Sequence, residues 1–265
     1  MKIISIIPAR MGSSRFPNKP MKKINGIPMI GHVYYRVDMS KILSETYVAT
    51  CDKEIFDYIE SINGKAIMTS PSHERASDRT AEAMLKIEKL TQNKIDIVVM
   101  VQGDEPLVTP KMINQALEPI KKDSNIKVVN LMAEIKTIDE FENPNEIKVI
   151  VDSNSDAIYL SREPIPSRKK CSTIVPMYKQ VCIIPFQRDY LLKFNSIEEG
   201  PLEKIESIDM LRIIENMDKV RMIKTEEKSI SVDTKEDLVI ANQLMKNDKL
   251  VIKYLSKIKS INNER

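Results

Sequence analysis

The chain has 265 residues, of which 42% are hydrophobic and 30% are charged, and its net charge is +3 at pH 7. We expect an ordinary soluble globular protein with one large α/β domain, and the small net charge argues against a general nucleic-acid binder. No apolar run approaches the roughly 20 residues that a membrane span needs. The three cysteines show no CxxC spacing and the chain has only two histidines, so a zinc site is not expected. The same cysteine pattern is typical of a reduced, cytoplasmic protein.

The first stretch combines a buried strand with a basic loop. Residues 3–7 read IISII, a β-branched run typical of a strand that is buried on both faces, and Pro8 bounds it. The loop that follows carries three cations and two hydroxyls, namely Arg10, Ser13, Ser14, Arg15 and Lys19. Ligands of open α/β sheets bind at the carboxyl ends of strands, and Arg and Lys suit phosphate oxygens, so we interpret the loop as a polyphosphate site. The alternative is a solvated basic loop.

Strands and helices alternate through the first half of the chain. Predicted strands cover residues 46–50, 65–68 and 96–101. Predicted helices cover 27–37, a segment from 53 capped by Asp52, a segment through 90 after a polar loop at 70–79, and a segment opened by Thr109 and Pro110. This alternation predicts an α/β fold with a mostly parallel central sheet flanked by helices.

The alternation stops at about residue 125. Predicted strands at 128–135, 147–151, 157–160 and 177–184 have no full helices between them, which indicates a small mixed or antiparallel insertion over about 125–200. A helix at 205–216, a strand at 220–224 and a helix opened by Thr234, with Asp237 in a capping box, follow. We therefore predict a single domain over 1–247 and a Lys-rich C-terminal helix or tail over 248–265.

A carboxylate follows the most apolar strand, in the sequence Gln102-Gly103-Asp104-Glu105-Pro106. Mg²⁺ needs few carboxylates because phosphate and water supply its other ligands, so we predict Asp104 as a metal ligand. Asp233, which also stands between a strand and a helix, is the second candidate. The alternatives are a turn in which Asp104 caps a helix, and an ordinary helix-terminal role for Asp233.

Two further groups of cations suggest anion binding. Arg79 lies near the start of a predicted helix, where a cation is unfavourable unless it has an anionic partner, which Asp78 could also provide. Arg162, Arg168, Lys169 and Lys170 are the cations of the basic segment SREPIPSRKK, which is either a solvated loop or a clamp for an anionic acceptor.

Six segments carry a family resemblance over about residues 1–245: IIPARMGSSRFPNKP, GIPMI, VQGDEP, NPNEIKVIVD, GPLEKIESIDMLR and SVDTKEDL. In this order they resemble the 3-deoxy-manno-octulosonate (Kdo) cytidylyltransferases, also called CMP-Kdo synthetases. The resemblance implies a Rossmann-like nucleotidyltransferase fold with a small dimerisation insertion, and a homodimer. It implies transfer of CMP from CTP to a hydroxyl of a 2-keto-3-deoxy sugar acid, with release of pyrophosphate, for surface-polysaccharide or lipopolysaccharide synthesis.

The resemblance also implies roles for individual residues. Catalytic roles fall on Arg10, Arg15, Lys19, Asp104 and Asp233, with Mg²⁺ held by Asp104 and Asp233. Nucleotide contacts fall on Pro8, Ala9, Arg10, Ser13, Arg15, Lys19, Arg79, Gln102 and Gly103. Acceptor contacts fall on Arg162, Gln180, Glu206 and Asp209.

The chain departs from the family pattern mainly where the acceptor would bind. Ala76-Ser77 replaces a Gly-Thr pair, Gln180 replaces a histidine, Ile184 replaces a tyrosine, and Asp209-Met210 replaces a Glu-Gln pair. One alternative is therefore a cytidylyltransferase for another ulosonate or a phosphonate. Another is a non-catalytic nucleotide-binding protein. A nucleic-acid module is disfavoured because the sequence has no basic-aromatic stripe.

Overall fold

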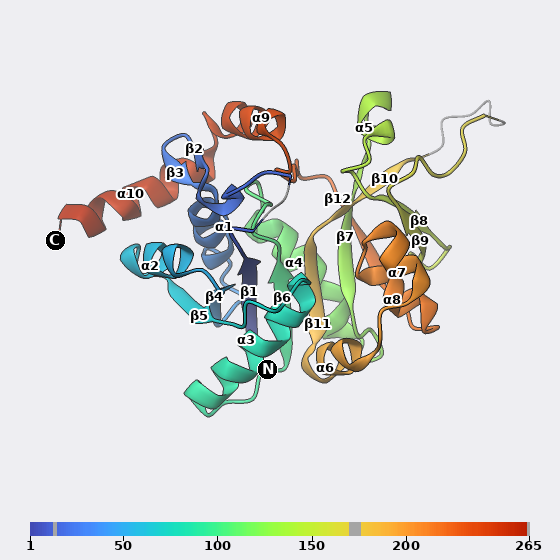
Figure 1. Ribbon diagram of the computed structural model, residues 1–265, viewed down its shortest axis with the longest axis horizontal. Coiled ribbons are helices and arrows are strands. Elements are labelled where there is room, and N and C mark those ends of the chain that lie inside the picture. Colours follow the sequence, from blue (N-terminus) through green and yellow to red (C-terminus); the bar gives the residue numbers. More distant parts are fainter. Residues whose placement is uncertain (13–14, 170–175, 264–265) are drawn as a thin grey trace. The chain divides into compact units, whose positions relative to one another are not determined.

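The computed structural model describes residues 1–12, 15–169 and 176–263, with side chains described through residue 256. The chain divides into one unit of residues 1–113 and 229–265 and a second unit of residues 114–228 (Figure 1). The prediction of a single domain over 1–247 with an insertion stays a prediction. Among the described residues, no helix is long and apolar enough to cross a membrane.

The first unit contains a parallel sheet built on its first strand. Four of its strands lie in the order β6-β1-β4-β5, with bounds Ile97–Val101 for β6, Ile3–Ala9 for β1, Glu45–Thr50 for β4 and Lys65–Met68 for β5. Each neighbouring pair among them is parallel, which confirms the predicted parallel sheet. Every residue of β1 and β6 is buried, as expected for isoleucine- and valine-rich strands covered on both faces.

The prediction that Pro8 bounds the first strand was wrong, because β1 continues to Ala9. The pairs of β1 with β6 end at Ile6, while those with β4 continue through Pro8 and Ala9. Pro8 therefore lies beyond the β6 pairing, where the missing N–H of proline costs no hydrogen bond to that strand.

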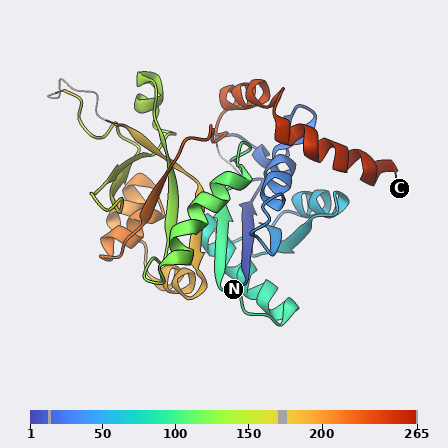
Figure 2. The ribbon, with the colours of Figure 1, turned by 180° about the vertical axis from the view of Figure 1, so that it is seen from behind.

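Helices follow the strands of the first unit as predicted. They are α1 (Met29–Asp38), α2 (Lys53–Ser61), α3 (Ala76–Thr91) and the start of α4 (Pro110–Lys122). Two further helices of this unit, α9 (Lys235–Met245) and α10 (Lys249–Asn263), come after the second unit in the chain. The short elements η1 (Lys19–Met21), β2 (Lys23–Ile24) and β3 (Ile27–Pro28) precede α1. Figures 1 and 2 show α10 in red beside α1 in blue.

The second unit contains a mixed sheet, as predicted for this part of the chain. Its order is β12-β7-β10-β8-β9, and the β7–β10, β10–β8 and β8–β9 pairs are antiparallel while β12–β7 is parallel. The bounds are Arg221–Thr225 for β12, Val129–Glu134 for β7, Tyr178–Val181 for β10, Lys148–Val151 for β8 and Ala157–Ser161 for β9.

Two predicted elements of the second unit are each split. The predicted strand at 177–184 is β10 and a separate strand β11 (Ile183–Gln187), because the chain bends at Cys182. The predicted helix at 205–216 is α7 (Pro201–Glu206) and α8 (Met210–Glu215), because Ser207 has φ 54° and the left-handed conformation ends a helix. Helices α5 (Ile138–Glu142) and α6 (Arg188–Ser196) were not predicted.

Candidate active site

Hydrogen bonds fix the basic loop that follows β1. The N–H of Met11 donates to Asp52 Oδ2 at 2.8 Å, and the N–H of Asn18 donates to the Met11 carbonyl at 3.2 Å. Asp52 thus binds this loop with its carboxylate, whereas the sequence predicted that the side chain would cap α2. Asn18 has φ 58°, a left-handed conformation that asparagine tolerates, and η1 begins immediately after it with Lys19. The loop therefore presents Lys19 from the start of a short helix.

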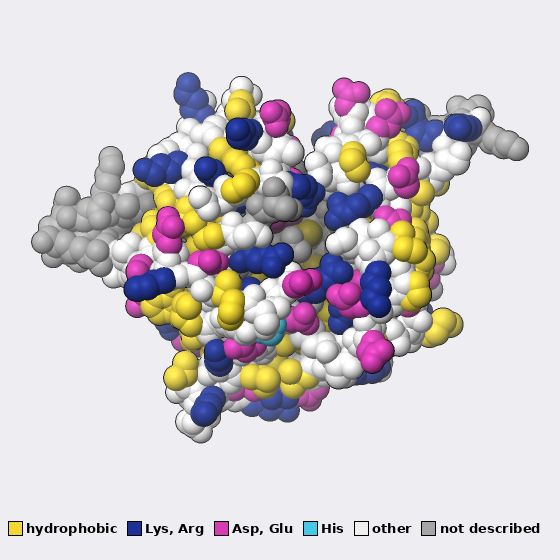
Figure 3. Space-filling view, in the orientation of Figure 1, with side chains coloured by type: hydrophobic (Ala, Val, Ile, Leu, Met, Phe, Trp, Pro, Cys, Tyr) yellow, Lys and Arg dark blue, Asp and Glu magenta, His cyan; other side chains and the backbone are white. Residues whose placement is uncertain are grey.

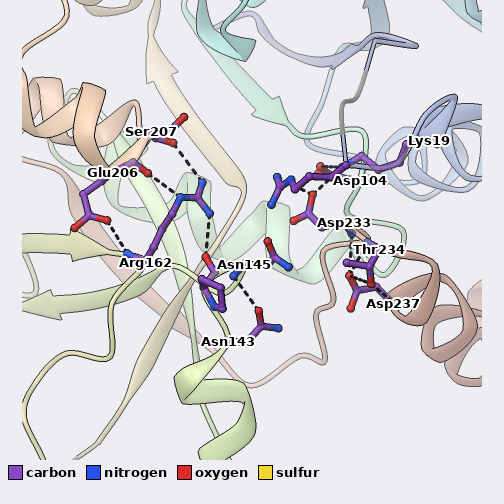
Figure 4. A network of polar contacts seen from close by, with 12 residues as sticks. Lys19, Asp104, Asn143, Asn145, Arg162, Glu206, Ser207, Asp233, Thr234 and Asp237 are labelled. Atoms are coloured by element: carbon purple, nitrogen blue, oxygen red, sulfur yellow. Dashed lines mark hydrogen bonds and ion pairs between the residues drawn. The ribbon is translucent and has the colours of Figure 1, made fainter.

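Lys19 lies between two carboxylates (Figure 4). Its Nζ is 2.7 Å from Asp104 Oδ2 and 3.1 Å from Asp233 Oδ1, and only 12% of the Lys19 side chain is exposed. Burial by itself lowers the pKa of Lys19, but the charges of Asp104 and Asp233 outweigh burial, so its pKa is raised. Lys19 is therefore a firmly charged ammonium at neutral pH.

Arg15 adds a second cation to this group. Its Nη2 is 3.1 Å from Asp233 Oδ1, and about half of its side chain is exposed. The structure thus brings together Arg15, Lys19, Asp104 and Asp233, which we call the ion cluster. With two cations and two carboxylates it carries no net charge, and the exposed Arg15 gives it a solvent-facing side. Their catalytic roles stay predictions.

Glycine at position 103 lets the Asp104 turn pack against the end of β1. A Cβ on Gly103 would lie 3.1 Å from the Pro8 carbonyl oxygen and 3.4 Å from Ala9 Cβ. The carbonyl of Asp104 accepts from the N–H of Val232 at 3.0 Å, which joins this turn to the segment carrying Asp233. The backbone beside Asp104 is therefore formed by Gly103 packed against Pro8 and Ala9. The nucleotide contacts predicted for these three residues stay predictions.

The predicted capping box at the start of α9 is confirmed, and it also holds Asp233. Asp237 Oδ2 accepts from the N–H groups of Thr234 at 2.8 Å and Asp233 at 3.0 Å, while Thr234 Oγ1 accepts from the Asp237 N–H at 3.1 Å. Because Asp237 and Thr234 satisfy the helix terminus, the Asp233 carboxylate is available to Lys19 (Figure 4). It also pairs with Arg15.

The residues of the ion cluster fit a Mg²⁺ ion. Within the described part of the chain, Asp104 Oδ1 is buried and has no hydrogen-bond partner. Asp104 and Asp233 share the Lys19 ammonium, and the Oδ1 atom of Asp104 has no partner among the described residues. Such a pair of carboxylates supplies the few protein oxygens that Mg²⁺ uses together with phosphate and water. Among the described residues, no group of three or more His, Cys, Asp or Glu side chains that could hold a metal occurs.

Arg10 and Arg79 both bind the loop before α3. Arg10 Nη1 lies 3.5 Å from the His73 carbonyl, and Arg79 Nη2 donates to the same carbonyl at 3.1 Å. Arg79 is 2% exposed and also donates to Thr69 Oγ1 at 2.5 Å and the Ser70 carbonyl at 3.3 Å. These contacts show that Arg79 shapes the loop, and its nucleotide contact stays a prediction.

Gln102 and Ser13 are the remaining residues with a predicted nucleotide contact. Gln102 is half-buried, and its carbonyl accepts from the Glu105 N–H at 3.2 Å in the turn that contains Asp104. Ser13 lies outside the described residues.

In the second unit, Glu206 and Arg162 hold each other (Figure 4). Glu206 Oε2 accepts from the Arg162 N–H at 2.8 Å, and Glu206 Oε1 accepts from Ser161 Oγ at 2.6 Å. The Arg162 guanidinium donates to the carbonyls of Glu206 at 2.7 Å, Pro144 at 3.0 Å and Ser207 at 3.4 Å. The arginine predicted as an acceptor clamp is therefore oriented by backbone carbonyls.

The remaining acceptor candidates also lie in the second unit. Gln180 Nε2 donates to Asn130 Oδ1 at 2.5 Å, and Asn130 is completely buried in β7. Asp209 is half-buried at the start of α8. The structure brings Arg162 and Glu206 into contact, and the acceptor roles of all four residues stay predictions.

Residues 4–243 match the protein family described as Cytidylyltransferase. A protein of Geobacter metallireducens named 3-deoxy-manno-octulosonate cytidylyltransferase is 40% identical over 248 residues, which cover 90% of this chain and 95% of that protein. A protein of Thermodesulfovibrio yellowstonii with the same name is 41% identical over 252 residues, covering 92% of this chain and 98% of that protein. The chain belongs to the cytidylyltransferase family.

A solved structure agrees with this membership. The structure of a CMP:2-keto-3-deoxy-manno-octonic acid synthetase complexed with CTP has 34% sequence identity and a TM-score of 0.84, covering 93% of this chain and 99% of that chain. The likeness confirms the predicted α/β nucleotidyltransferase fold, and the chain is a CTP-dependent nucleotidyltransferase.

Sequence reasoning missed one lysine that organises the second unit of this cytidylyltransferase. Lys148 is fully buried, and its Nζ donates to the carbonyls of Arg162 at 2.5 Å and Asn143 at 2.9 Å. Burial lowers the pKa of Lys148. The sequence contains a signal for this residue. Lys148 is the first residue of the apolar strand KVIV, and a lysine is rarely fully buried in a strand unless it has polar partners.

Proposed function

We propose that this cytidylyltransferase transfers CMP from CTP to a hydroxyl of Kdo and releases pyrophosphate. The identity of about 40% to proteins named for this activity, over 90% or more of the chain, is the observation that carries the proposal. The ion cluster supports it, because two cations and two carboxylates suit a magnesium nucleotide. The product would serve surface-polysaccharide or lipopolysaccharide synthesis.

The proposed reaction is an in-line displacement at phosphorus. The acceptor hydroxyl oxygen forms a bond to the α-phosphorus, the bond from that phosphorus to the β-phosphate oxygen breaks, and the hydroxyl proton passes to solvent. Lys19, Arg15 and Arg10 would neutralise the negative charge that develops on the departing pyrophosphate, so their contribution is positioning and electrostatic stabilisation.

We propose Mg²⁺ as the cofactor, held by Asp104 and Asp233. When bound, it supplies positive charge to phosphate oxygens and lowers the pKa of a coordinated hydroxyl. We also propose a homodimer, as the family resemblance implies, and a cytoplasmic location, which the cysteine pattern favours. CTP and a small anionic sugar acid are the proposed partners. Nucleic acid is disfavoured because the net charge is only +3 and acidic side chains lie among the basic ones on the face shown in Figure 3.

Another ulosonate or a phosphonate is the second candidate acceptor. Gln180 and Ile184 stand where the resemblance expects a histidine and a tyrosine, and Ile184 is buried. The first change replaces an imidazole by an uncharged amide, and the second removes a phenolic hydroxyl, so both favour an acceptor other than Kdo.

The test is pyrophosphate release from CTP and Mg²⁺ with Kdo, run beside a panel of other sugar acids and phosphonates. We expect release with Kdo, and no detectable release by Asp104→Ala, with Glu118→Gln as a matched control because Glu118 is an exposed carboxylate paired with Lys122. Release only with another acid would keep the reaction and replace the acceptor. CTP binding without release for any acceptor would overturn catalysis, and full activity of Asp104→Ala would overturn the metal assignment.

A further inference from the structure

Two buried polar residues lie one turn apart on α1 and face the same side. His32 is 0% exposed and Arg36 is 1% exposed. Residues four apart in a helix share a face, so both side chains can bind the same neighbouring helix. Neither belongs to the ion cluster, and burying two such polar groups costs stability unless each is well paired.

Arg36 binds the chain just beyond Asp104. Its Nε donates to the Val108 carbonyl at 2.7 Å and its Nη2 donates to the Leu107 carbonyl at 3.4 Å. Its Nη1 is 3.1 Å from Asp248 Oδ2. One guanidinium thus joins the segment that follows Asp104 to the start of α10.

His32 makes the equivalent connection on the Lys19 side. Its Nε2 lies 2.7 Å from the carbonyl of Ile24 in β2, and its Nδ1 lies 2.5 Å from Tyr254 Oη. Because a carbonyl can only accept, Nε2–H donates to Ile24 and Nδ1 accepts from the tyrosine hydroxyl. β2 follows η1, the short helix that contains Lys19. Lys22 lies between these two elements, and its carbonyl accepts from the N–H of Met29 in α1 at 2.8 Å.

Tyr254 of α10 and Asp248, which immediately precedes α10, make further contacts of their own. Tyr254 is 2% exposed and stacks on Tyr35 with ring centroids 5.3 Å apart. Asp248 Oδ1 also accepts from the N–H of Leu250 at 2.7 Å, which starts the helix. The match to the cytidylyltransferase family ends at residue 243, before α10 begins. The residues of the ion cluster lie within the family match, whereas α10 lies outside it and adds contacts to the segments that carry the cluster.

We propose that His32 and Arg36 are positioning residues, through which α10 holds the backbones next to Lys19 and Asp104 at the spacing that magnesium-bound CTP requires. The inference rests on the proposed function, since it takes CTP and Mg²⁺ as the ligands. α1 transmits the constraint because each of its two side chains binds one site-carrying segment and one residue at the start of α10 or within it, namely Asp248 for Arg36 and Tyr254 for His32. Loosening either connection widens the range of separations between Lys19 and Asp104 and weakens binding of the nucleotide.

The experiment measures CTP binding to the full chain by calorimetry in the presence of Mg²⁺, without any acceptor. The test variants are Tyr254→Phe, which removes the hydroxyl that binds His32 and Arg36, and Asp248→Asn, which removes the negative charge and the acceptor oxygen that face Arg36 while its remaining oxygen can still accept from the N–H of Leu250. Tyr35→Phe is the matched control for the first, since within the described chain the buried Tyr35 hydroxyl has no partner while its ring stacks on Tyr254. Asp57→Asn is the control for the second, since Asp57 forms an exposed ion pair with Lys53.

We expect each test variant to bind CTP at least fivefold more weakly and each control to stay within twofold of the unaltered chain. A purely structural role would lower the number of binding sites per chain and the unfolding temperature, but leave the affinity of the folded fraction unchanged, and that result would overturn the inference. Absence of CTP binding by the unaltered chain would overturn it as well. Binding without pyrophosphate release would overturn only the proposed function, because this readout needs no acceptor.

Discussion

Lys19 contacts the same two carboxylates that are proposed to hold Mg²⁺. Its Nζ lies within 3.1 Å of both Asp104 and Asp233, so a divalent cation that binds these oxygens competes with the ammonium. A triphosphate attracts the ammonium as well, and therefore relieves the competition. We therefore expect CTP and Mg²⁺ to raise each other's affinity, and linkage requires the same factor for both.

Lys19→Met should change the two affinities in opposite directions. CTP should bind at least tenfold more weakly because the variant loses a charge-assisted phosphate contact, whereas Mn²⁺, used as the probe for the metal, should bind more tightly because its competitor is gone. Calorimetry for CTP and electron paramagnetic resonance for Mn²⁺ measure the two affinities. Lys23→Met, which alters an exposed lysine of β2, is the control. Weaker Mn²⁺ binding by the variant would contradict the competition.

His32 should make stability depend on pH. Burial, with a smaller effect from Arg36, lowers the pKa of His32 from its ordinary 6.5 to about 4. The unfolded chain therefore binds a proton that the folded chain does not, and the free energy of unfolding falls as pH falls from about 6.5 to about 4, by up to about 1.4 kcal/mol per pH unit. The slope should be shallower in His32→Gln when urea unfolding is compared at pH 5 and pH 7. An equal slope in both proteins would exclude His32 as the source.

At the scale of elements, the start of α9 serves both stability and the ion cluster. The Thr234–Asp237 capping box begins the helix, and Asp237 also accepts a hydrogen bond from the N–H of Asp233. Local helix chemistry thus fixes the backbone of a proposed metal ligand. Thr137 is the N-cap of α5 in the second unit, where its side chain accepts from the Glu140 N–H, so the chain contains a matched cap away from the cluster.

Thr234→Ala and Thr137→Ala should each lower the free energy of unfolding by about 1 kcal/mol, the usual cost of losing such a cap. Only Thr234→Ala should also weaken CTP binding in the presence of Mg²⁺, because only that cap precedes α9 and adjoins Asp233. Urea unfolding followed by circular dichroism gives the first quantity and calorimetry gives the second. Equal CTP affinities in the two variants would show that the cap does not position Asp233.

At the scale of the whole molecule, the proposed homodimer predicts a sedimenting mass of twice 30.4 kDa. Ile158 of β9 lies within the predicted dimerisation insertion and is 53% exposed, while Leu90 of α3 is 72% exposed and lies outside it. Ile158→Lys should therefore lower the mass toward one chain at micromolar concentration, because burying a lysine in an apolar contact is costly, whereas Leu90→Lys should not. A single-chain mass for the unaltered protein would refute the dimer.

Local sequence determined the elements of the parallel sheet and the identity of the charged residues. The isoleucine run of β1, the apolar run of β6 and the Thr234–Asp237 cap are patterns within a few residues, and such patterns set secondary structure through burial and capping. Asp104 and Lys19 were found because they follow buried strands, where parallel sheets place their ligands. The resemblance supplied the nucleotide and the acceptor.

Only the tertiary structure decided which of these groups touch. Lys19 is 85 residues from Asp104 and 214 from Asp233 in sequence, and no local pattern measures such a separation in space. The same holds for His32 and Arg36, which read as ordinary positions in a helical stretch until α10 packs against them. The periodicity of apolar residues indicates which face of a helix or strand is buried. Which residues pack against that face depends on how distant segments of the chain fold together. This packing creates the ion cluster and its connection to α10.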